Sequence, residues 1–204
     1  MSDMSAMSEL PSPVPDAGRH PYRVIMVCTG NICRSAMAEV VARDRLQDVG
    51  VPDLGAGGVA VTSAGVSSEE QGNPMDPRAR RVLAEAGYTG EAANVIAAHR
   101  AHRMTDAEIL GADLLLAMTD AHHRVLARRA GALGADPSRI LMYRELDPAA
   151  GELRAAVRAG TASRRALDVP DPWYGTMADF VETLEVVERV SDVLAERLRE
   201  RAGA

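Results

Sequence analysis

The chain has 204 residues, which suits one α/β domain, and its 47% of hydrophobic residues are enough for a substantial core. Its formal net charge of −6 argues against a nucleic-acid-binding protein, because such proteins gain affinity by neutralising phosphates. Two cysteines are too few for the disulfide framework of a secreted protein, and no segment approaches the roughly 20 apolar residues that cross a bilayer. We therefore expect a cytoplasmic protein with no nucleic-acid or membrane partner.

The N-terminal stretch 1–21 is rich in Ser, Pro and Met and shows no periodicity, which predicts a disordered tail. It lacks the positive start and apolar run of a signal peptide. We take the remaining residues, 22–204, as a single domain.

Four short apolar runs bounded by turn residues predict buried strands at 22–28, 58–65, 113–118 and 139–143. Helix-forming stretches between and after them predict helices at 35–50, 76–88, 105–112, 120–131 and 176–203. The long connection at 147–168 has room for a helical turn or two. This alternation predicts an open, doubly wound, four-stranded parallel sheet with helices on both faces, and ligands bound beyond the C-terminal ends of its strands.

Both cysteines lie in "VCTGNICRSA" (27–36), between the first predicted strand and the first predicted helix. Backbone N–H groups and the dipole at a helix N-terminus bind anions, and Gly30 and Asn31 can take the positive φ that curls N–H groups into a nest. Such surroundings favour the anionic form of a thiol, and arginine offers a planar fork to phosphate oxygens. We predict an ionised nucleophile at Cys28 on the floor of an anion cradle made by Thr29, Gly30, Asn31, Ile32, Cys33 and Arg34.

A simpler interpretation treats Cys28 as a buried structural cysteine and Arg34 as a surface charge. That interpretation would suffice for a cysteine and an arginine at this spacing alone. Here the preceding strand, the Gly-Asn turn, the hydroxyl of Ser35 and the following helix all agree with an anion site.

The stretch "VCTGNICRS" resembles the phosphate-binding loop of the low-molecular-weight protein tyrosine phosphatases. The similarity continues through further stretches, namely "TSAG" (62–65), "GNPMDPRA" (72–79), "AAHRAHRMT" (97–105), "DLLLAMTDAH" (113–122) and "VPDPWYG" (169–175). It runs from about 22 to about 200 and leaves out the N-terminal tail and residues 149–166. The resemblance implies a flavodoxin-like fold and hydrolysis of phosphotyrosine in proteins.

The resemblance also implies a two-step mechanism. Cys28 attacks phosphorus while Asp171 protonates the phenolic leaving group, and Asp171 then activates the water that hydrolyses the cysteinyl phosphate. Arg34 and the loop amides hold the phosphoryl oxygens. On sequence alone Asp171 belongs to a turn signal, so only the match to "VPDPWYG" selects it over Asp168, its nearest rival.

Supporting roles follow from the resemblance as well. Ser35 is expected to hydrogen-bond the thiolate, and Asn31, Ser63 and His99 to keep the loop curled. Cys33 is expected either to form a reversible disulfide with Cys28, protecting it from irreversible oxidation, or merely to pack beneath the loop. No cofactor is implied, and no metal, because the histidine pairs lack further ligands at suitable spacing.

Several positions depart from the family pattern. Glu69 and Glu70 stand where several members have an aromatic wall, so we expect them to repel acidic residues on either side of the phosphorylated residue of a substrate. Trp173 and Tyr174 can supply the other wall. Thr119 follows Met118 where an aspartate is common.

We expect partners limited to a phosphorylated protein substrate and inorganic phosphate or oxyanion inhibitors, with the protein a monomer.

Three alternatives remain. A protein-arginine phosphatase branch shares "CTGN", including Thr29, but tends to have threonine where this chain has Ile32, whose apolar bulk suits a flat phenyl ring. An arsenate reductase branch needs cysteines downstream, and none follows Cys33. A non-catalytic phosphate-binding or thiol redox-sensing module would not need an acid, so the presence of Asp171 argues against it.

Overall fold

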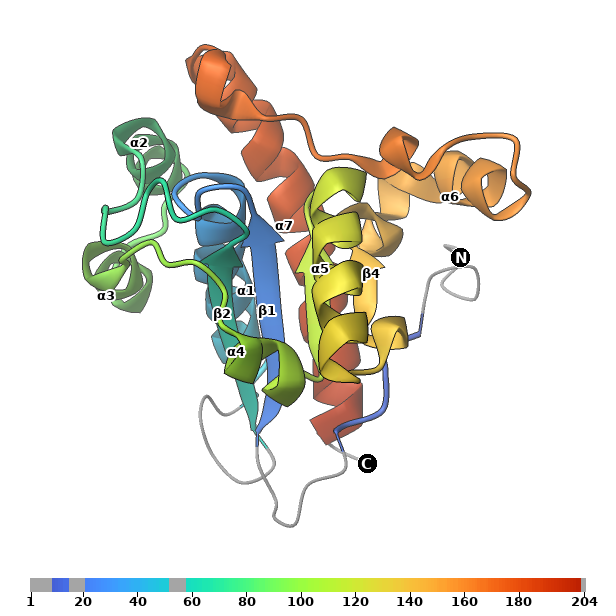
Figure 1. Cartoon of the computed structure of the whole chain (residues 1–204). Helices are drawn as coiled ribbons and strands as arrows, with labels where there is room; N and C mark the ends of the chain where they lie inside the picture. The colour runs from blue at the N-terminus through green and yellow to red at the C-terminus, as the bar shows by residue number, and fades with distance from the viewer. Residues whose placement is uncertain (1–8, 15–20, 52–57, 203–204) are drawn as a thin grey trace.

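The computed structural model describes residues 9–14, 21–51 and 58–202 and contains one four-stranded sheet (Figure 1). Its strands are β1 (Tyr22–Cys28), β2 (Val59–Gly65), β3 (Leu114–Ala117) and β4 (Ile140–Met142). All pair in parallel in the order β2-β1-β3-β4, with Cys28 opposite Gly65 at the end of β1. The predicted open parallel sheet is confirmed, and each strand begins and ends within one residue of its prediction.

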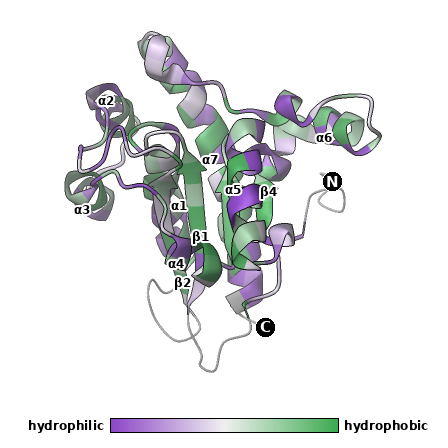
Figure 2. Ribbon diagram, viewed as in Figure 1, coloured by the Kyte–Doolittle hydropathy of each residue, from purple (hydrophilic) through white to green (hydrophobic). Residues whose placement is uncertain are grey.

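Alternate residues of the central strand β1 enter two separate cores, because side chains of a strand point to opposite faces. Val24 and Met26 pack into the core under α1 (Arg34–Asp48) and α7 (Met177–Ala202). Ile25 and Val27 pack into the core under α4 (Asp106–Gly111) and α5 (Asp120–Leu133). Helices therefore cover both faces, and the hydropathy colouring shows apolar strands between them (Figure 2).

Three further helices lie towards the edges of the sheet. Figure 1 shows α2 (Pro77–Glu85) and α3 (Glu91–Ala98) beyond the β2 edge and α6 (Gly151–Arg158) beyond the β4 edge. The sequence did not predict α3, which follows a glycine at φ 59°, has no side-chain cap and buries only Ala92. No helix within the described ranges is both long enough and apolar enough to cross a bilayer.

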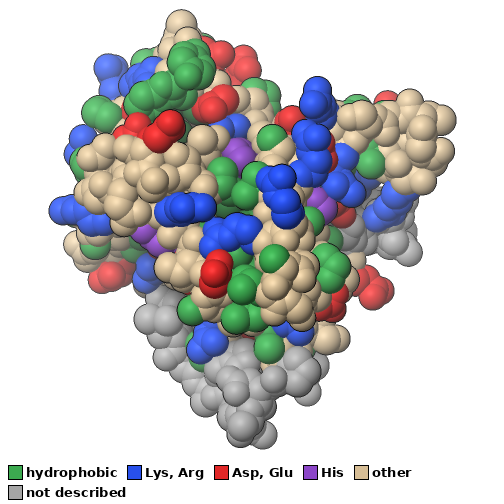
Figure 3. All heavy atoms as spheres, viewed as in Figure 1, with side chains coloured by type: hydrophobic (Ala, Val, Ile, Leu, Met, Phe, Trp, Pro, Cys, Tyr) green, Lys and Arg blue, Asp and Glu red, His purple; other side chains and the backbone are tan. Residues whose placement is uncertain are grey.

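Basic and acidic side chains are interspersed on the face that carries α4 and α5 (Figure 3). Ion pairs join Arg129 to Asp106 at 2.6 Å and Arg124 to Asp120 at 3.2 Å. This face therefore carries paired charges of both signs.

Residues 9–14 pack against the domain, although the sequence predicts disorder throughout 1–21. Leu10 packs against the larger core, and the carbonyl of Pro11 accepts hydrogen bonds from Tyr22 (2.9 Å) and Arg201 (2.8 Å). The amide of Val14 donates to Asp113 at 2.6 Å. The other predicted tail residues, except residue 21, lie outside the described residues.

A buried carboxylate fastens the connection 147–168 to α7. Asp147 accepts hydrogen bonds from Arg144 and Arg189, both at 3.1 Å, and its carbonyl accepts one from Arg154. Burial alone would raise the pKa of Asp147, but the hydrogen bonds from Arg189 and Arg144 outweigh it and lower the pKa. The negative charge of Asp147 therefore stabilises the folded state.

We expect Asp147→Asn to lower the free energy of unfolding by about 1.5–3 kcal/mol at pH 7, since it removes hydrogen bonds between charged groups. The folded-state pKa is depressed, so the advantage of the wild type is complete above about pH 4 and shrinks as the pH falls below it. Urea unfolding at pH 7, 5 and 3.5 measures both effects. The exposed Asp136 is the control, and an equal loss in Asp136→Asn, or a loss independent of pH, would contradict this account.

Candidate active site

The predicted nucleophile, acid, phosphate-loop and wall residues, with the exception of Asn31, line a cavity of about 140 Å³ at the C-terminal end of the sheet. Asn31, Ser35, Ser63 and His99 do not line it. The loop between β1 and α1 forms its floor. The segment that carries Asp171 and the segment that carries Glu70 form its walls. The lining residues are Cys28, Thr29, Gly30, Ile32, Cys33, Arg34, Glu69, Glu70, Asp171, Trp173 and Tyr174.

The sulfur of Cys28 lies at the floor of the curled loop. It accepts a hydrogen bond from the amide of Asn31 at 3.3 Å and lies 3.0 Å from the hydroxyl of Ser35. Asn31 has φ 60°, whereas Gly30, for which we also expected a positive φ, does not. Gly30 lies close to the side chain of Glu70, since an added Cβ would be 2.8 Å from Cγ of Glu70 and that side chain would have to move.

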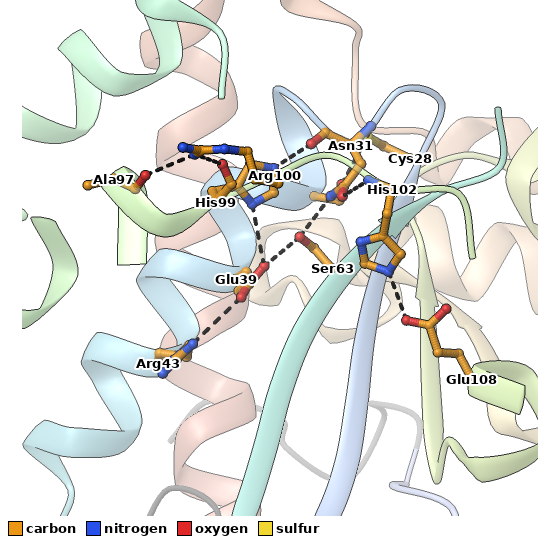
Figure 4. Close-up of polar contacts among 11 residues, drawn as sticks. Cys28, Asn31, Glu39, Arg43, Ser63, Ala97, His99, Arg100, His102 and Glu108 are labelled. Carbon is orange, nitrogen blue, oxygen red and sulfur yellow. Dashed lines mark hydrogen bonds and ion pairs between the residues drawn. The ribbon is translucent and has the colours of Figure 1, made fainter. Parts of the chain in front are cut away.

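The side chain of Asn31 holds this conformation with hydrogen bonds on both of its polar atoms (Figure 4). Its amide nitrogen donates to Ser63 at 2.8 Å and to Ser35 at 3.1 Å. Its amide oxygen accepts from the backbone of His102 at 3.2 Å. Because Asn31 is fully buried, breaking these bonds would leave polar atoms without partners.

His99 and Glu39 extend the network beneath the loop (Figure 4). Nε2 of His99 lies 2.7 Å from the carbonyl of Asn31, and Nδ1 lies 3.9 Å from Glu39. The hydroxyl of Ser63 donates to the same Glu39 oxygen at 2.5 Å. Burial raises the pKa of Glu39, against the opposing effects of Ser63 and His99. Sequence reasoning missed Glu39, although its place one helical turn after Ser35 puts both on one face of α1.

Arg34 and Asp171, which are far apart in sequence, meet at the cavity. Nη2 of Arg34 lies 2.6 Å from Oδ2 of Asp171, and Nη1 donates to the carbonyl of Val169 at 3.1 Å. The other oxygen of Asp171 accepts from the backbone of Trp173 at 3.2 Å. Asp168, the rival acid, instead accepts from the backbone of Asp120 at 2.6 Å and does not line the cavity.

Comparison with known proteins identifies the family. Residues 23–203 match the family described as "Low molecular weight phosphotyrosine protein phosphatase". A low molecular weight protein-tyrosine-phosphatase from Streptomyces coelicolor is 38% identical, covering 88% of this chain and 95% of the relative. Low molecular weight protein-tyrosine phosphatase A from Mycobacterium tuberculosis is 39% identical, covering 89% and 94%. The chain belongs to this family.

Other relatives extend the comparison. A protein-arginine-phosphatase from Geobacillus stearothermophilus is 31% identical, covering 88% of this chain and 97% of the relative. A protein tyrosine phosphatase from Entamoeba histolytica, crystallised with Hepes in its active site, has the same fold, with a TM-score of 0.67 and 23% identity over 87% of this chain and 97% of that one. The chain is thus a phosphatase of the low-molecular-weight family, with Cys28 in its phosphate-binding loop.

Arg78 of this phosphatase clamps the loop that carries Asp171, a function that sequence reasoning missed. Its guanidinium forms two hydrogen bonds with Asp76, at 3.1 and 3.0 Å, and donates to the carbonyls of Trp173 (3.1 Å) and Gly175 (3.3 Å). It also stacks on the ring of Trp173. Asp76 is also the N-cap of α2, because its side chain accepts a hydrogen bond from the backbone of Arg78, so this carboxylate has two structural functions.

The second cysteine of the phosphatase, Cys33, is buried, and both cysteines are free thiols. Burial raises the pKa of Cys33, with the charge of Asp76 adding to the effect, so its thiol stays protonated at neutral pH.

At the cavity mouth Trp173 is 37% exposed and Tyr174 is 92% exposed, which leaves the Tyr174 ring available to a substrate. Among the described residues, no group of three or more acidic, histidine or cysteine side chains could hold a metal.

We expect both Asn31→Ala and Asn31→Gly to weaken binding of inorganic phosphate at least about tenfold, because each removes the buried hydrogen bonds of the side chain. Glycine accepts a positive φ without strain, so Asn31→Gly separates the hydrogen bonds from the backbone conformation. Isothermal titration calorimetry measures the affinity. Wild-type affinity in Asn31→Gly would show that the side-chain network is not needed.

We expect Arg78→Ala to loosen the loop that carries Asp171 and to reduce turnover about tenfold, while phosphate still binds to the loop of Cys28. Trp173 is the only tryptophan of the chain, so acrylamide quenching of its fluorescence reports on this loop directly. Quenching should rise in Arg78→Ala and stay at the wild-type level in Arg80→Ala, a change at a nearby exposed arginine. Unchanged quenching in Arg78→Ala would contradict the clamp.

Proposed function

We propose that the protein hydrolyses phosphotyrosine in proteins through a cysteinyl-phosphate intermediate, with Cys28 as nucleophile and Asp171 as general acid and base. The observation that carries this proposal is the convergence of Cys28, Arg34 and Asp171 on one cavity. A thiolate, a phosphate-binding cation and an acid are the three groups that cleavage of a phosphomonoester by cysteine requires.

In the first step the sulfur of Cys28 forms a bond to phosphorus as the bond to the phenolic oxygen breaks. Asp171 supplies the proton to that oxygen, and Arg34 with the loop amides stabilises the charge on the phosphoryl oxygens. Phosphate oxygens and Asp171 compete for the same guanidinium, so binding of substrate frees the carboxyl group for its proton transfer.

In the second step Asp171 accepts a proton from water, the oxygen of which attacks phosphorus and displaces the sulfur. The hydroxyl of Ser35, 3.0 Å from the sulfur, stabilises the departing thiolate. Asn31, Ser63 and His99 act indirectly, because their hydrogen bonds keep the loop around the sulfur.

The cavity walls favour a flat aromatic leaving group. Ile32 narrows the entrance with apolar bulk, and Trp173 and Tyr174 offer rings against which a tyrosyl ring can stack. Phosphoarginine is the second candidate. Thr29 matches the arginine phosphatase pattern, a relative with that name is 31% identical, and the carboxylates of Glu69 and Glu70 could pair with a guanidinium.

We further propose that the protein acts as a monomer in the cytoplasm, where both cysteines stay reduced. An oxidant such as hydrogen peroxide would convert the Cys28 thiolate to a sulfenic acid. Condensation with the Cys33 thiol would then release water and form a disulfide. Burial raises the pKa of Cys33, so we expect this second step to be slow at neutral pH.

We expect Cys28→Ser to abolish turnover of a phosphotyrosine peptide and Asp171→Ala to reduce kcat by roughly 10²–10⁴. The loss in Asp171→Ala should be smaller for p-nitrophenyl phosphate, whose leaving group needs less protonation. Asp168→Ala is the matched control and should lose far less. Equal losses in the two aspartate variants would refute the assignment of the acid.

Rates on phosphotyrosine, phosphoserine and phosphoarginine peptides test the substrate class. We expect phosphotyrosine to be preferred, and Ile32→Thr to shift the preference towards phosphoarginine because it widens the entrance and adds a hydroxyl. Equal wild-type rates on all three peptides would overturn the argument from Ile32.

A further inference from the structure

His122 has a contact with the phosphate-binding loop that the mechanism above does not use. It lies in the first turn of α5 and is 5% exposed, and its Nε2 lies 2.9 Å from the hydroxyl of Thr29. Thr29 follows Cys28 directly and lines the cavity. The ring is not needed to cap α5, because the side chain of Thr119 already accepts a hydrogen bond from the backbone of His122.

The imidazole of His122 is neutral. Burial, and then the positive charge of Arg34, lower the pKa of His122 to about 4. At neutral pH the ring therefore has a single N–H group, on either Nδ1 or Nε2.

The surroundings decide which nitrogen has the proton. Nδ1 is buried and has no hydrogen-bond partner among the residues that the structure describes. A buried N–H without an acceptor is less well tolerated than an unpaired acceptor atom. The proton therefore belongs on Nε2, which donates to the hydroxyl oxygen of Thr29. That oxygen accepts from His122, so the hydroxyl proton of Thr29 remains available to another acceptor.

We infer that His122 orients the Thr29 hydroxyl so that it donates a hydrogen bond to an oxygen of the bound phosphoryl group. Thr29 is then a binding residue through its side chain, in addition to its backbone, and His122 is a positioning residue that acts through Thr29. The inference rests on the proposed function only in that the cavity binds a phosphoryl group. The Thr29 hydroxyl would be an uncharged donor to the phosphoryl group. Unlike the guanidinium of Arg34, it does not pair with Asp171.

The test is the affinity for inorganic phosphate and vanadate, measured by calorimetry on the full chain, together with kcat and KM for a phosphotyrosine peptide. Thr29→Val and His122→Leu should each weaken oxyanion binding roughly tenfold, because each loses or misdirects one hydrogen bond to a charged group. Thr29→Ser retains the hydroxyl, and His122→Gln retains a donor, so both should recover most of the affinity. His123→Gln is the matched control on the adjacent, partly exposed histidine and should bind phosphate like the wild type.

A double variant separates action through Thr29 from a general effect on folding. If His122 acts through Thr29, the combination of Thr29→Val with His122→Leu should bind phosphate about as weakly as either single variant. Additive losses would overturn the inference, as would a His122→Leu variant with a lower melting temperature but unchanged phosphate affinity. If the wild type bound phosphate but did not turn over the peptide, the proposed function would be refuted. The comparison of phosphate affinities among the Thr29 and His122 variants would still be valid. A wild type that binds no phosphate would refute both.

Discussion

The hydrogen bonds of one buried amide keep the active-site loop in a conformation that side-chain-bearing residues seldom adopt. Asn31 has φ 60°, and its side chain joins Ser35 in α1, Ser63 in β2 and the backbone of His102. This conformation turns its own N–H towards the sulfur of Cys28. The anion site therefore depends on contacts among three separate segments, and the loop sequence alone would not maintain it.

The sheet brings these segments together. In a parallel sheet the C-terminal ends of all strands lie at one edge, so the loops after β1, β2 and β3 meet there. Gly65 ends β2 beside the loop of Cys28, and an added Cβ at Gly65 would lie 2.6 Å from the carbonyl of Thr29. A side chain at this position would push the loop away from the strand, which explains the glycine in "TSAG".

The acid reaches the cavity through a different set of contacts. The amide of Val169 donates to the carbonyl of Met118 at the end of β3, and the next residues follow the rim towards Arg34. Arg78 then holds the carbonyls of Trp173 and Gly175. Asp171 is thus fixed at both ends of a short proline-bounded loop, and its carboxylate pairs with Arg34.

The sequence predicted the strands well because each is a short apolar run, and β1 was predicted with its observed bounds. The loop of Cys28 could be predicted because its residues are consecutive in the sequence, at the junction of one strand, one turn and one helix. The sequence did not predict α3, which has no side-chain cap and fully buries only Ala92. The sequence did not reveal the structural roles of Glu39, Arg78 and His122. Each contacts a partner that is far away in sequence, or depends on burial that no local pattern shows.

The most direct test of the account is to identify the residue that carries phosphate during turnover. The wild type would be mixed rapidly with an aryl phosphate that has a good leaving group and quenched at neutral pH in denaturant. Peptide mass spectrometry with fragmentation would then locate the phosphoryl group. The account predicts phosphate on the sulfur of Cys28. Phosphate on another residue, or product formed with no phosphoenzyme at any time during a rapid burst, would contradict it.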